Sequence, residues 1–238
     1  MSIWGDNMLT TKDLTLHYGG SQILHGIDFA AKAGEVTCVM GTNGVGKTSL
    51  FKALAGTHPR SGGGITIDGE EIGKLRPQDI AKRGVGYVPQ GRMVFPLLTV
   101  TENLETGFSI LPRAERFIPD EIYDLFPVLK DMSHRRGGDL SGGQQQQLAI
   151  ARAMIMKPKI LLLDEPTEGI QPNIIQQIGR VIKYLRDEKG MAVVLVEQYF
   201  DFAYDLGDQF YVLKRGAVAM SGSKAELGEA ALRATVSV

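Results

Sequence analysis

A glycine-rich segment in the first quarter of the chain carries residue types that bind phosphate. Residues 41–48 follow the spacing G-x-x-x-x-G-K-[ST], and Ser49 comes directly after them. Glycines let backbone N–H groups point into one turn, and the start of a following helix adds positive potential. We predict that nucleotide phosphates bind to Gly41, Thr42, Asn43, Gly44, Val45, Gly46, Lys47, Thr48 and Ser49. The alternative is a chance glycine-rich turn, in a chain with 29 glycines.

The flanking residues favour the phosphate site over that alternative. Residues 36–40 form a short apolar run typical of a buried strand, and residues 50–55 read as a helix that Gly56 ends. In this strand–loop–helix context Lys47 is expected to bridge the terminal phosphates, and the Thr48 hydroxyl to hold a Mg²⁺ ion.

Two adjacent acids, Asp164 and Glu165, follow the apolar residues 160–163. Open α/β sheets bind their ligands at the carboxyl ends of the strands, where a carboxylate can hold magnesium directly or through water. We expect Asp164 to be that metal ligand and Glu165 to act on an attacking water. The alternative is that both acids only cap the next helix.

A second helix start also has the composition of an anion site. It lies within Leu140-Ser141-Gly142-Gly143-Gln144. Glycine in a helix interior costs about 0.8–1 kcal/mol relative to alanine, so a pair of glycines makes sense if N–H groups must approach an anion closely. Ser141 is expected to cap this helix, which continues to about residue 156.

These motifs resemble those of the ATP-binding cassette family, whose LSGGQ sequence stands here at residues 140–144. The resemblance runs in order along essentially the whole chain, and it implies that the nucleotide is ATP. It also implies that Tyr18 stacks on adenine and that Gln90 contacts the Mg²⁺ ion. For Tyr18 the alternative is a tyrosine of an edge strand beside a turn.

Members of that family work as pairs. Two cassettes face each other head to tail, and each ATP lies between the phosphate loop of one and the LSGGQ motif of the other. The resemblance therefore implies that Ser141, Gly142, Gly143 and Gln144 bind, in trans, the ATP of a second ATPase subunit. ATP binding then closes the dimer, hydrolysis opens it, and integral membrane permease subunits use this cycle.

Two positions depart from the common pattern of the family. The residue after Glu197 is usually a histidine that senses the terminal phosphate, and here it is Gln198. Glutamine can donate a hydrogen bond to phosphate but carries no charge, so we expect Gln198 to be a substitute sensor, with weak or absent hydrolysis as the competing interpretation. The loop 167–172 lacks the usual aspartate near its end, which puts its contacts across the dimer in doubt.

Three segments narrow the resemblance to one branch. Residues 91–96, 165–172 and 196–198 resemble the ATPases of branched-chain amino acid importers, with the urea-uptake branch nearest. A run of glutamines at 144–147 also suggests that branch, although a solvated helix face explains it equally well. In such importers two different ATPases usually pair beneath two permeases. An extracytoplasmic binding protein delivers the substrate to these permeases.

The predicted function is therefore an ATP-hydrolysing importer subunit for urea, a small amide or branched-chain amino acids. The alternative is a clamp that binds ATP, hydrolyses little of it and acts as the non-catalytic partner of another ATPase. A cassette acting on DNA or ribosomes is disfavoured, because such proteins usually carry a coiled-coil insertion or a second cassette. The net charge of -1 also gives no general attraction to nucleic acid.

Composition places the chain among cytoplasmic globular proteins. Apolar residues make up 43% and charged residues 22% of its 238 residues, and the single cysteine, Cys38, suits a reducing compartment. No window of 18 apolar residues could span a membrane, and residues 1–6 show no secretory signal. We expect a protein held on the inner face of the membrane through its permease partners.

The elements that position these motifs predict an α/β fold. Unbroken apolar runs at 160–163 and 192–196 are typical of parallel strands covered on both faces. Strands at 9–18 and 23–29 predict an N-terminal antiparallel β layer. Together these give a P-loop NTPase core with a mostly parallel sheet and an added antiparallel layer.

Residues from about 91 to 157 show helical patterns without strong strands. We predict one domain, 1–238, in which a helical subdomain at approximately 91–157 is inserted between the parts 1–90 and 158–238 of the core. Helices are expected at 119–130 and 172–189, with a hairpin around residues 215–216 and a tail from 223 that forms a short helix and then frays.

Overall fold

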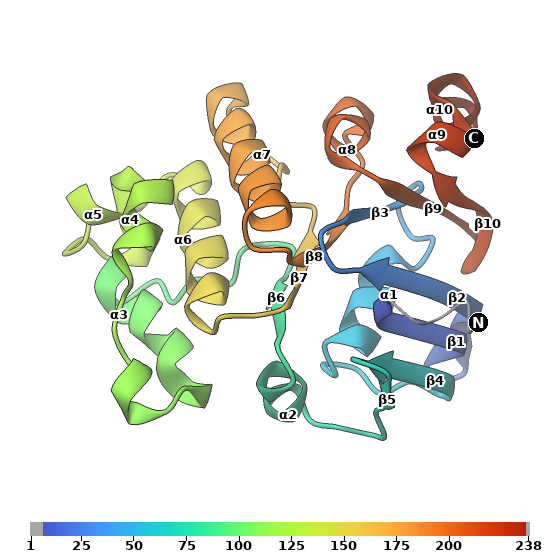
Figure 1. The fold of residues 1–238 in the computed structure, drawn as a ribbon, viewed down its shortest axis with the longest axis horizontal. Coiled ribbons are helices and arrows are strands. Elements are labelled where there is room, and N and C mark those ends of the chain that lie inside the picture. The colour runs from blue at the N-terminus through green and yellow to red at the C-terminus, as the bar shows by residue number, and fades with distance from the viewer. Residues whose placement is uncertain (1–6, 237–238) are drawn as a thin grey trace.

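The fold is described by a computed structural model, which covers residues 7–236. Residues 1–6, where we expect no secretory signal, lie outside the described residues, as do residues 237–238. The chain forms two β-sheets and a group of helices that extends to one side (Figure 1). Between residues 7 and 236, no helix combines the length and the apolar character that a membrane crossing requires.

A six-stranded sheet lies at the centre of the molecule, with the order β10-β9-β3-β8-β7-β6. Its neighbours pair in parallel, apart from the antiparallel pair β9 and β10. The hairpin between those two turns at Arg215 and Gly216, whose φ angles of 46° and 77° suit a tight turn. The strands are β3 (Val36–Met40), β6 (Val85–Val88), β7 (Ile160–Asp164), β8 (Ala192–Val196), β9 (Gln209–Lys214) and β10 (Ala217–Ser223).

A second sheet is antiparallel and has the order β2-β1-β4-β5. It corresponds to the β layer predicted at the N-terminal side, with longer strands than the sequence suggested. The strands are β1 (Asn7–Tyr18), β2 (Ser21–Lys32), β4 (Gly62–Ile67) and β5 (Glu70–Glu71). Side chains of this sheet and of the six-stranded sheet pack in one core with α1 (Lys47–Leu54), the helix that follows the glycine-rich loop.

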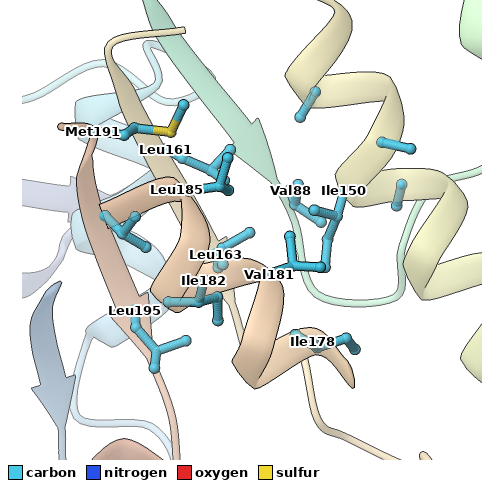
Figure 2. Packing of buried hydrophobic residues seen from close by; sticks show 14 of the residues in the cluster. Val88, Ile150, Leu161, Leu163, Ile178, Val181, Ile182, Leu185, Met191 and Leu195 are labelled. Carbon is cyan, nitrogen blue, oxygen red and sulfur yellow. The ribbon is translucent and has the colours of Figure 1, made fainter. Parts of the chain in front are cut away.

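The strand β7 is fully buried on both faces, which explains why its sequence does not alternate. On one face Leu161 and Leu163 pack with α7 (Pro172–Asp187) and α6 (Gly142–Ile155), as Figure 2 shows. On the other face Ile160 and Leu162 join the core around α1. Burial of such side chains contributes about 1.5–3 kcal/mol each, so the carboxyl end of β7 is held firmly in place.

Helices occupy the chain between β6 and β7, and no regular strand occurs in this stretch, all of which the structure describes. Figure 1 shows them gathered on the side of the molecule away from the four-stranded sheet. The predicted cap at Ser141 is confirmed, and both Ser141 and Thr99 form capping boxes at the starts of their helices. The segments are α3 (Val100–Glu105), α4 (Asp120–Leu125), α5 (Pro127–Asp131), α6, and 3-10 turns at Thr106–Ile110, Arg113–Glu115 and Gly137–Asp139.

The single helix predicted for residues 119–130 is wrong. The structure has two short helices, α4 and α5, with a break at Phe126, whose φ is -132°. Pro127 explains the break, because proline has no N–H group to donate and disfavours helical geometry in the residue before it. Phe126 is nevertheless fully buried.

For the tail from residue 223, the predicted short helix is confirmed, and the predicted fraying after it is wrong as far as residue 236. Two helices follow, α9 (Lys224–Leu227) and α10 (Glu229–Val236). Leu232 in α10 is fully buried, and the Arg233 guanidinium lies 2.6 Å from the Asp201 carboxylate on α8 (Phe200–Leu206). Tertiary contacts therefore order a segment whose local sequence is weakly structured. The remaining helix, α2 (Pro77–Lys82), precedes β6.

Candidate functional site

The glycine-rich loop joins the end of β3 to the start of α1 and needs glycine at specific positions. Gly46 caps α1 with a φ of 107°, in the left-handed region that other residues avoid. At Gly41 an added Cβ would lie 2.5 Å from the carbonyl oxygen of Leu213 on β9. The loop therefore follows a path that only this glycine spacing allows, and it directs the start of α1 toward the carboxyl edge of the sheet.

Lys47 is the first residue of α1, and its ammonium group is folded over the loop. Its Nζ donates hydrogen bonds to the carbonyl oxygens of Gly41 (2.8 Å) and Thr42 (3.0 Å), and it lies 3.8 Å from Oε1 of Glu165. Burial lowers the pKa of Lys47, while the nearby carboxylates of Glu165 and Asp164 act in the opposite direction. The side chain is thus a buried cation beside two acids, held by acceptors that phosphate oxygens can replace.

Asp164 ends β7 and is almost completely buried. The Thr48 hydroxyl donates to its Oδ1 at 3.3 Å, and the Tyr87 hydroxyl donates to its Oδ2 at 3.4 Å. Burial raises the pKa of Asp164 to about 6, against which these hydrogen bonds act only in part. The Lys47 ammonium also compensates the ionised carboxylate only in part, and a cation at this position would supply the rest.

Thr48 and Asp164 are chemically suited to Mg²⁺, since this ion prefers oxygen ligands in an octahedral arrangement. Within residues 7–236 no group of three His, Cys, Asp or Glu side chains forms a metal site of its own. Magnesium is commonly held by one or two carboxylates together with substrate phosphates. Gln90 donates through Nε2 to Glu165, so its carbonyl oxygen remains the atom suited to a metal.

Glu165 receives donors from three separate parts of the chain. Nε2 of Gln198 lies 2.6 Å from Oε1, Nε2 of Gln90 lies 3.1 Å from Oε2, and the Lys47 ammonium lies near Oε1. Glu165 also has a φ of 49°, and its N–H donates to the carbonyl of Val196 on the adjacent strand. Such a conformation in a non-glycine residue costs about 1–3 kcal/mol and is typical of functional sites.

Glu197 is a site residue that the sequence did not single out. It is 2% exposed, and its Oε1 accepts from both the N–H and the hydroxyl of Thr167, at 3.1 and 2.7 Å. Its Oε2 accepts from the N–H groups of Gln198 and Tyr199. The carboxylate thus ties the loop after Glu165 to the loop that carries Gln198. The only sequence signal was an acid directly after a fully apolar strand.

Tyr18 lies at the rim of the site, at the end of β1, and is 39% exposed. Its ring stands 4.3 Å from that of His58, centroid to centroid, and the Lys52 ammonium lies 5.9 Å from the ring centroid. The Nε2 atom of His58 is 3.0 Å from the carbonyl oxygen of His17. Tyr18 is therefore supported by a neighbouring ring while part of it stays accessible for stacking. His58 is a second residue that the sequence did not reveal.

One cavity of about 420 Å³ brings most of the predicted residues together. Gly41, Thr42, Val45 and Asp164 do not line it, and form the loop and the carboxyl end of β7 behind it. Glu168 lines it without having been predicted, and accepts a hydrogen bond from Gln90 at 3.1 Å. The lining residues are Tyr18, Ile23, Asn43, Gly44, Gly46, Lys47, Thr48, Ser49, Gln90, Glu165, Glu168 and Gln198.

The motif at 140–144 lies elsewhere. The Ser141 hydroxyl oxygen caps α6 by accepting from the N–H of Gln144, and Oε1 of Gln144 accepts in turn from the N–H of Ser141. Ser141, Gly142, Gly143 and Gln144 line a second cavity, of about 490 Å³, that shares no lining residue with the first. Within one chain the two predicted phosphate sites therefore remain separate.

Comparisons with known proteins show which family the chain resembles. A family profile described as "ABC transporter" matches residues 24–168. BraG of Pseudomonas aeruginosa, a high-affinity branched-chain amino acid transport ATP-binding protein, is 42% identical over 92% of this chain and 94% of its own. LivF of Archaeoglobus fulgidus, a probable branched-chain amino acid transport ATP-binding protein, is 37% identical over 93% of this chain and 94% of its own. A dimeric, post-hydrolysis structure of the ATP-binding cassette MJ0796, bound to ADP and Pi, has a TM-score of 0.81 at 28% identity and covers 91% of this chain and 98% of that chain.

Proposed function

The chain belongs to the ATP-binding cassette family of transporter ATPases, and from this premise we propose that it drives an importer by ATP-dependent closure of a dimer. It is an ATP hydrolase with the α/β fold of such cassettes. One observation carries the proposal further: the Lys47 loop, the Thr48–Asp164 pair and the Glu165–Gln198 pair converge on one edge of the sheet.

We assign the binding of ATP first to the loop and to Lys47. The N–H groups of the loop and of the start of α1 surround the phosphates, and the Lys47 ammonium exchanges the carbonyls of Gly41 and Thr42 for phosphate oxygens. Thr48, Asp164 and the carbonyl of Gln90 would hold a Mg²⁺ ion, which would neutralise charge on the terminal phosphates. Tyr18 stacks on the adenine.

Glu165 orients the attacking water and accepts its proton. The amides of Gln198 and Gln90 hold the carboxylate from two sides, so it presents one fixed orientation to the water. A positioned general base contributes typically 10²–10⁴ in rate. Gln198 can turn its amide toward the terminal phosphate when ATP is present, which makes it the sensor in place of histidine.

Ser141, Gly142, Gly143 and Gln144 complete the site of a facing subunit. Their separation from the Lys47 cavity supports this assignment, because each cavity then forms one half of a site that closes on ATP. The dimeric form of the MJ0796 cassette is a precedent for such a pair. Binding of two ATP molecules stabilises the closed dimer, and hydrolysis removes that stabilisation.

We propose branched-chain amino acids as the transported class, on the basis of the relatives BraG and LivF. Urea or a small amide remains a prediction from residues 91–96, 165–172 and 196–198. The partners are a second ATPase, two permease subunits and an extracytoplasmic binding protein. The subunit sits on the cytoplasmic face of the membrane through its permeases.

Uptake by intact cells tests this function. Cells that carry the Lys47→Ala variant in place of the wild type should lose ATP-driven uptake of labelled leucine, or of labelled urea if the amide branch is correct. Lys12→Ala, at an exposed lysine on β1, is the matched control and should leave uptake unchanged. Normal uptake of both compounds in the Lys47→Ala cells would exclude an importer for either class.

A second candidate is an ATP-dependent clamp that dimerises with ATP while its partner hydrolyses. The glutamine at position 198 favours it, because a neutral amide replaces the histidine of the family. Slow phosphate release by the isolated protein, together with tight ATP-driven dimerisation, would support the clamp. Vigorous turnover by the isolated protein would exclude it.

A further inference from the structure

The guanidinium of Arg92 lies against the amino-terminal end of α6. A Cβ placed on Gly142 would be 2.9 Å from Nη1 and 3.1 Å from Nη2 of Arg92. The first turn of α6 contains no acidic residue, and among the described residues no carboxylate lies within 4.0 Å of the guanidinium. A half-buried cation thus adjoins a helix end that is itself positive.

The backbone that places Arg92 there has a strained conformation. Gly91, Arg92 and Met93 have consecutive φ angles of 78°, 67° and 47°, and the last two are unfavourable for residues with a Cβ. The N–H of Arg92 donates to Pro89, and Nη2 donates to the carbonyl of Glu168 at 3.1 Å. This bond uses one of five guanidinium N–H groups, and no other acceptor is found for them among residues 7–236.

A second unpaired group lies on the same helix. Gln147 is 1% exposed, and its Oε1 has no hydrogen-bond partner in the described part of the chain. It stands one turn after Gly143, and both line the cavity of about 490 Å³ that also contains Ser141. Unpaired buried polar groups are rare, and Oε1 is an acceptor, so the cavity has the character of a site that is completed by a ligand with a hydroxyl or N–H donor beside its phosphates, as a nucleotide has.

We propose that Arg92 is a phosphate-binding residue of the composite ATP site. Together with Ser141 and Gly143 of the same chain, its guanidinium contacts the terminal phosphate of the ATP that the facing subunit holds on its Lys47 loop. The anion neutralises both the guanidinium and the start of α6, and so removes the repulsion present in the single chain. This inference rests on the proposed function, since it needs the facing subunit.

The position of Arg92 gives it a second consequence. It follows Gln90 by two residues and holds the carbonyl of Glu168, whose carboxylate accepts from Gln90. Binding of a phosphate to the guanidinium therefore affects both the Gln90 segment and the loop after Glu165. In this way the nucleotide bound to the facing subunit influences Glu165, the catalytic carboxylate of this subunit.

ATP-driven dimerisation in the Glu165→Gln background tests the proposal. We would measure, by analytical ultracentrifugation, the ATP concentration that gives half-maximal dimer. Adding Arg92→Gln removes the charge and should raise this concentration at least about tenfold, equivalent to about 1.4 kcal/mol. Arg92→Lys keeps the charge and should raise it less than about threefold. Arg113→Gln, at an exposed arginine on the same helical side of the fold, is the control and should change nothing.

A second measurement separates phosphate binding from a structural role. Binding of a fluorescent ATP analogue to dilute, monomeric protein reports the Lys47 site alone, and all variants should bind it equally. Unchanged dimerisation of Arg92→Gln, equal losses in the Gln and Lys variants, or loss of monomer binding would each overturn the proposal. If the Glu165→Gln parent itself does not dimerise with ATP, the composite site fails independently of Arg92.

Discussion

Nε2 of Gln198 lies 2.6 Å from Oε1 of Glu165, although the two residues are 33 positions apart in the sequence. The contact crosses the carboxyl edge of the sheet, from the loop after β8 to the residue after β7. It keeps the carboxylate in a fixed orientation without adding a charge or a proton that titrates near neutral pH. Gln198 is therefore both a support for Glu165 and the reason why this cassette differs from the family pattern.

Replacement of Gln198 should change the rate and its pH dependence in separable ways. Gln198→Ala removes a hydrogen bond to a carboxylate, and phosphate release should fall about 10–100-fold. Gln198→His should retain more activity but acquire a step near pH 6.5, where imidazole becomes protonated and pairs with Glu165. The measurement is kcat from about pH 5.5 to 8. Equal kcat in the wild type and both variants over this range would show that Gln198 has no role in catalysis.

Asp164→Asn should stabilise the nucleotide-free protein while it abolishes Mg²⁺-dependent turnover. Burial raises the pKa of Asp164 from 3.8 to about 6, so the folded protein holds this proton more tightly than the unfolded chain. Its contribution to stability is therefore complete below pH 3.8 and is lost as pH rises through about 6, a loss of about 3 kcal/mol at neutral pH.

Urea unfolding at pH 4.5, 6 and 7.5 measures this effect. The Asn variant should exceed the wild type in free energy of unfolding by about 1–3 kcal/mol at pH 7.5, and the difference should shrink toward pH 4.5. Asp124→Asn, at an exposed residue of α4, is the control and should show no such trend. An advantage of Asp164→Asn that did not change with pH would contradict the raised pKa.

Glu197→Gln should weaken both the fold and the catalytic rate. The amide can accept through only one of its two terminal atoms, so donors such as the N–H groups of Gln198 and Tyr199 are left without an acceptor. We expect a loss of about 1–3 kcal/mol in the free energy of unfolding. Because Glu197 positions Gln198 and does not contact ATP, kcat should fall while KM for ATP changes little. A rise in KM with normal kcat would argue against this role.

Tyr18→Ala should weaken ATP binding, and Tyr18→Trp should preserve it. Stacking of a base on an aromatic side chain is worth about 1–3 kcal/mol, so the dissociation constant should rise about tenfold or more in the Ala variant. His58→Ala removes the ring behind Tyr18 and should have a smaller effect in the same direction. Calorimetric titration with Mg-ATP gives the constants. Full affinity in Tyr18→Ala would restore the simpler interpretation of an edge-strand tyrosine.

Sequence spacing was sufficient for the parts of the site that one local segment builds. The turn through Gly41 and Gly46 follows from glycine geometry, and the burial of β7 follows from its unbroken apolar run. The capping box at Ser141 could likewise be predicted, since its partner Gln144 stands only three residues away.

The parts that failed or were missed depend on contacts between distant segments. Glu197 acts through Thr167, and Arg92 reaches Glu168, so no local spacing reveals either side chain. The prediction of one helix through Phe126 gave too much weight to the apolar side chains and too little to Pro127, which interrupts the helix. The order of α10 depends on the burial of Leu232, which only the tertiary structure supplies.

The assignment of Glu165 as the group that activates water is tested most directly by phosphate release from Mg-ATP. Purified wild type and Glu165→Gln would be compared at saturating ATP, with Glu188→Gln, an exposed glutamate after α7, as the control. We predict that the Glu165→Gln rate falls 10²–10⁴-fold while ATP binding is retained and the control is unaffected. An unchanged rate of phosphate release in Glu165→Gln would contradict the account.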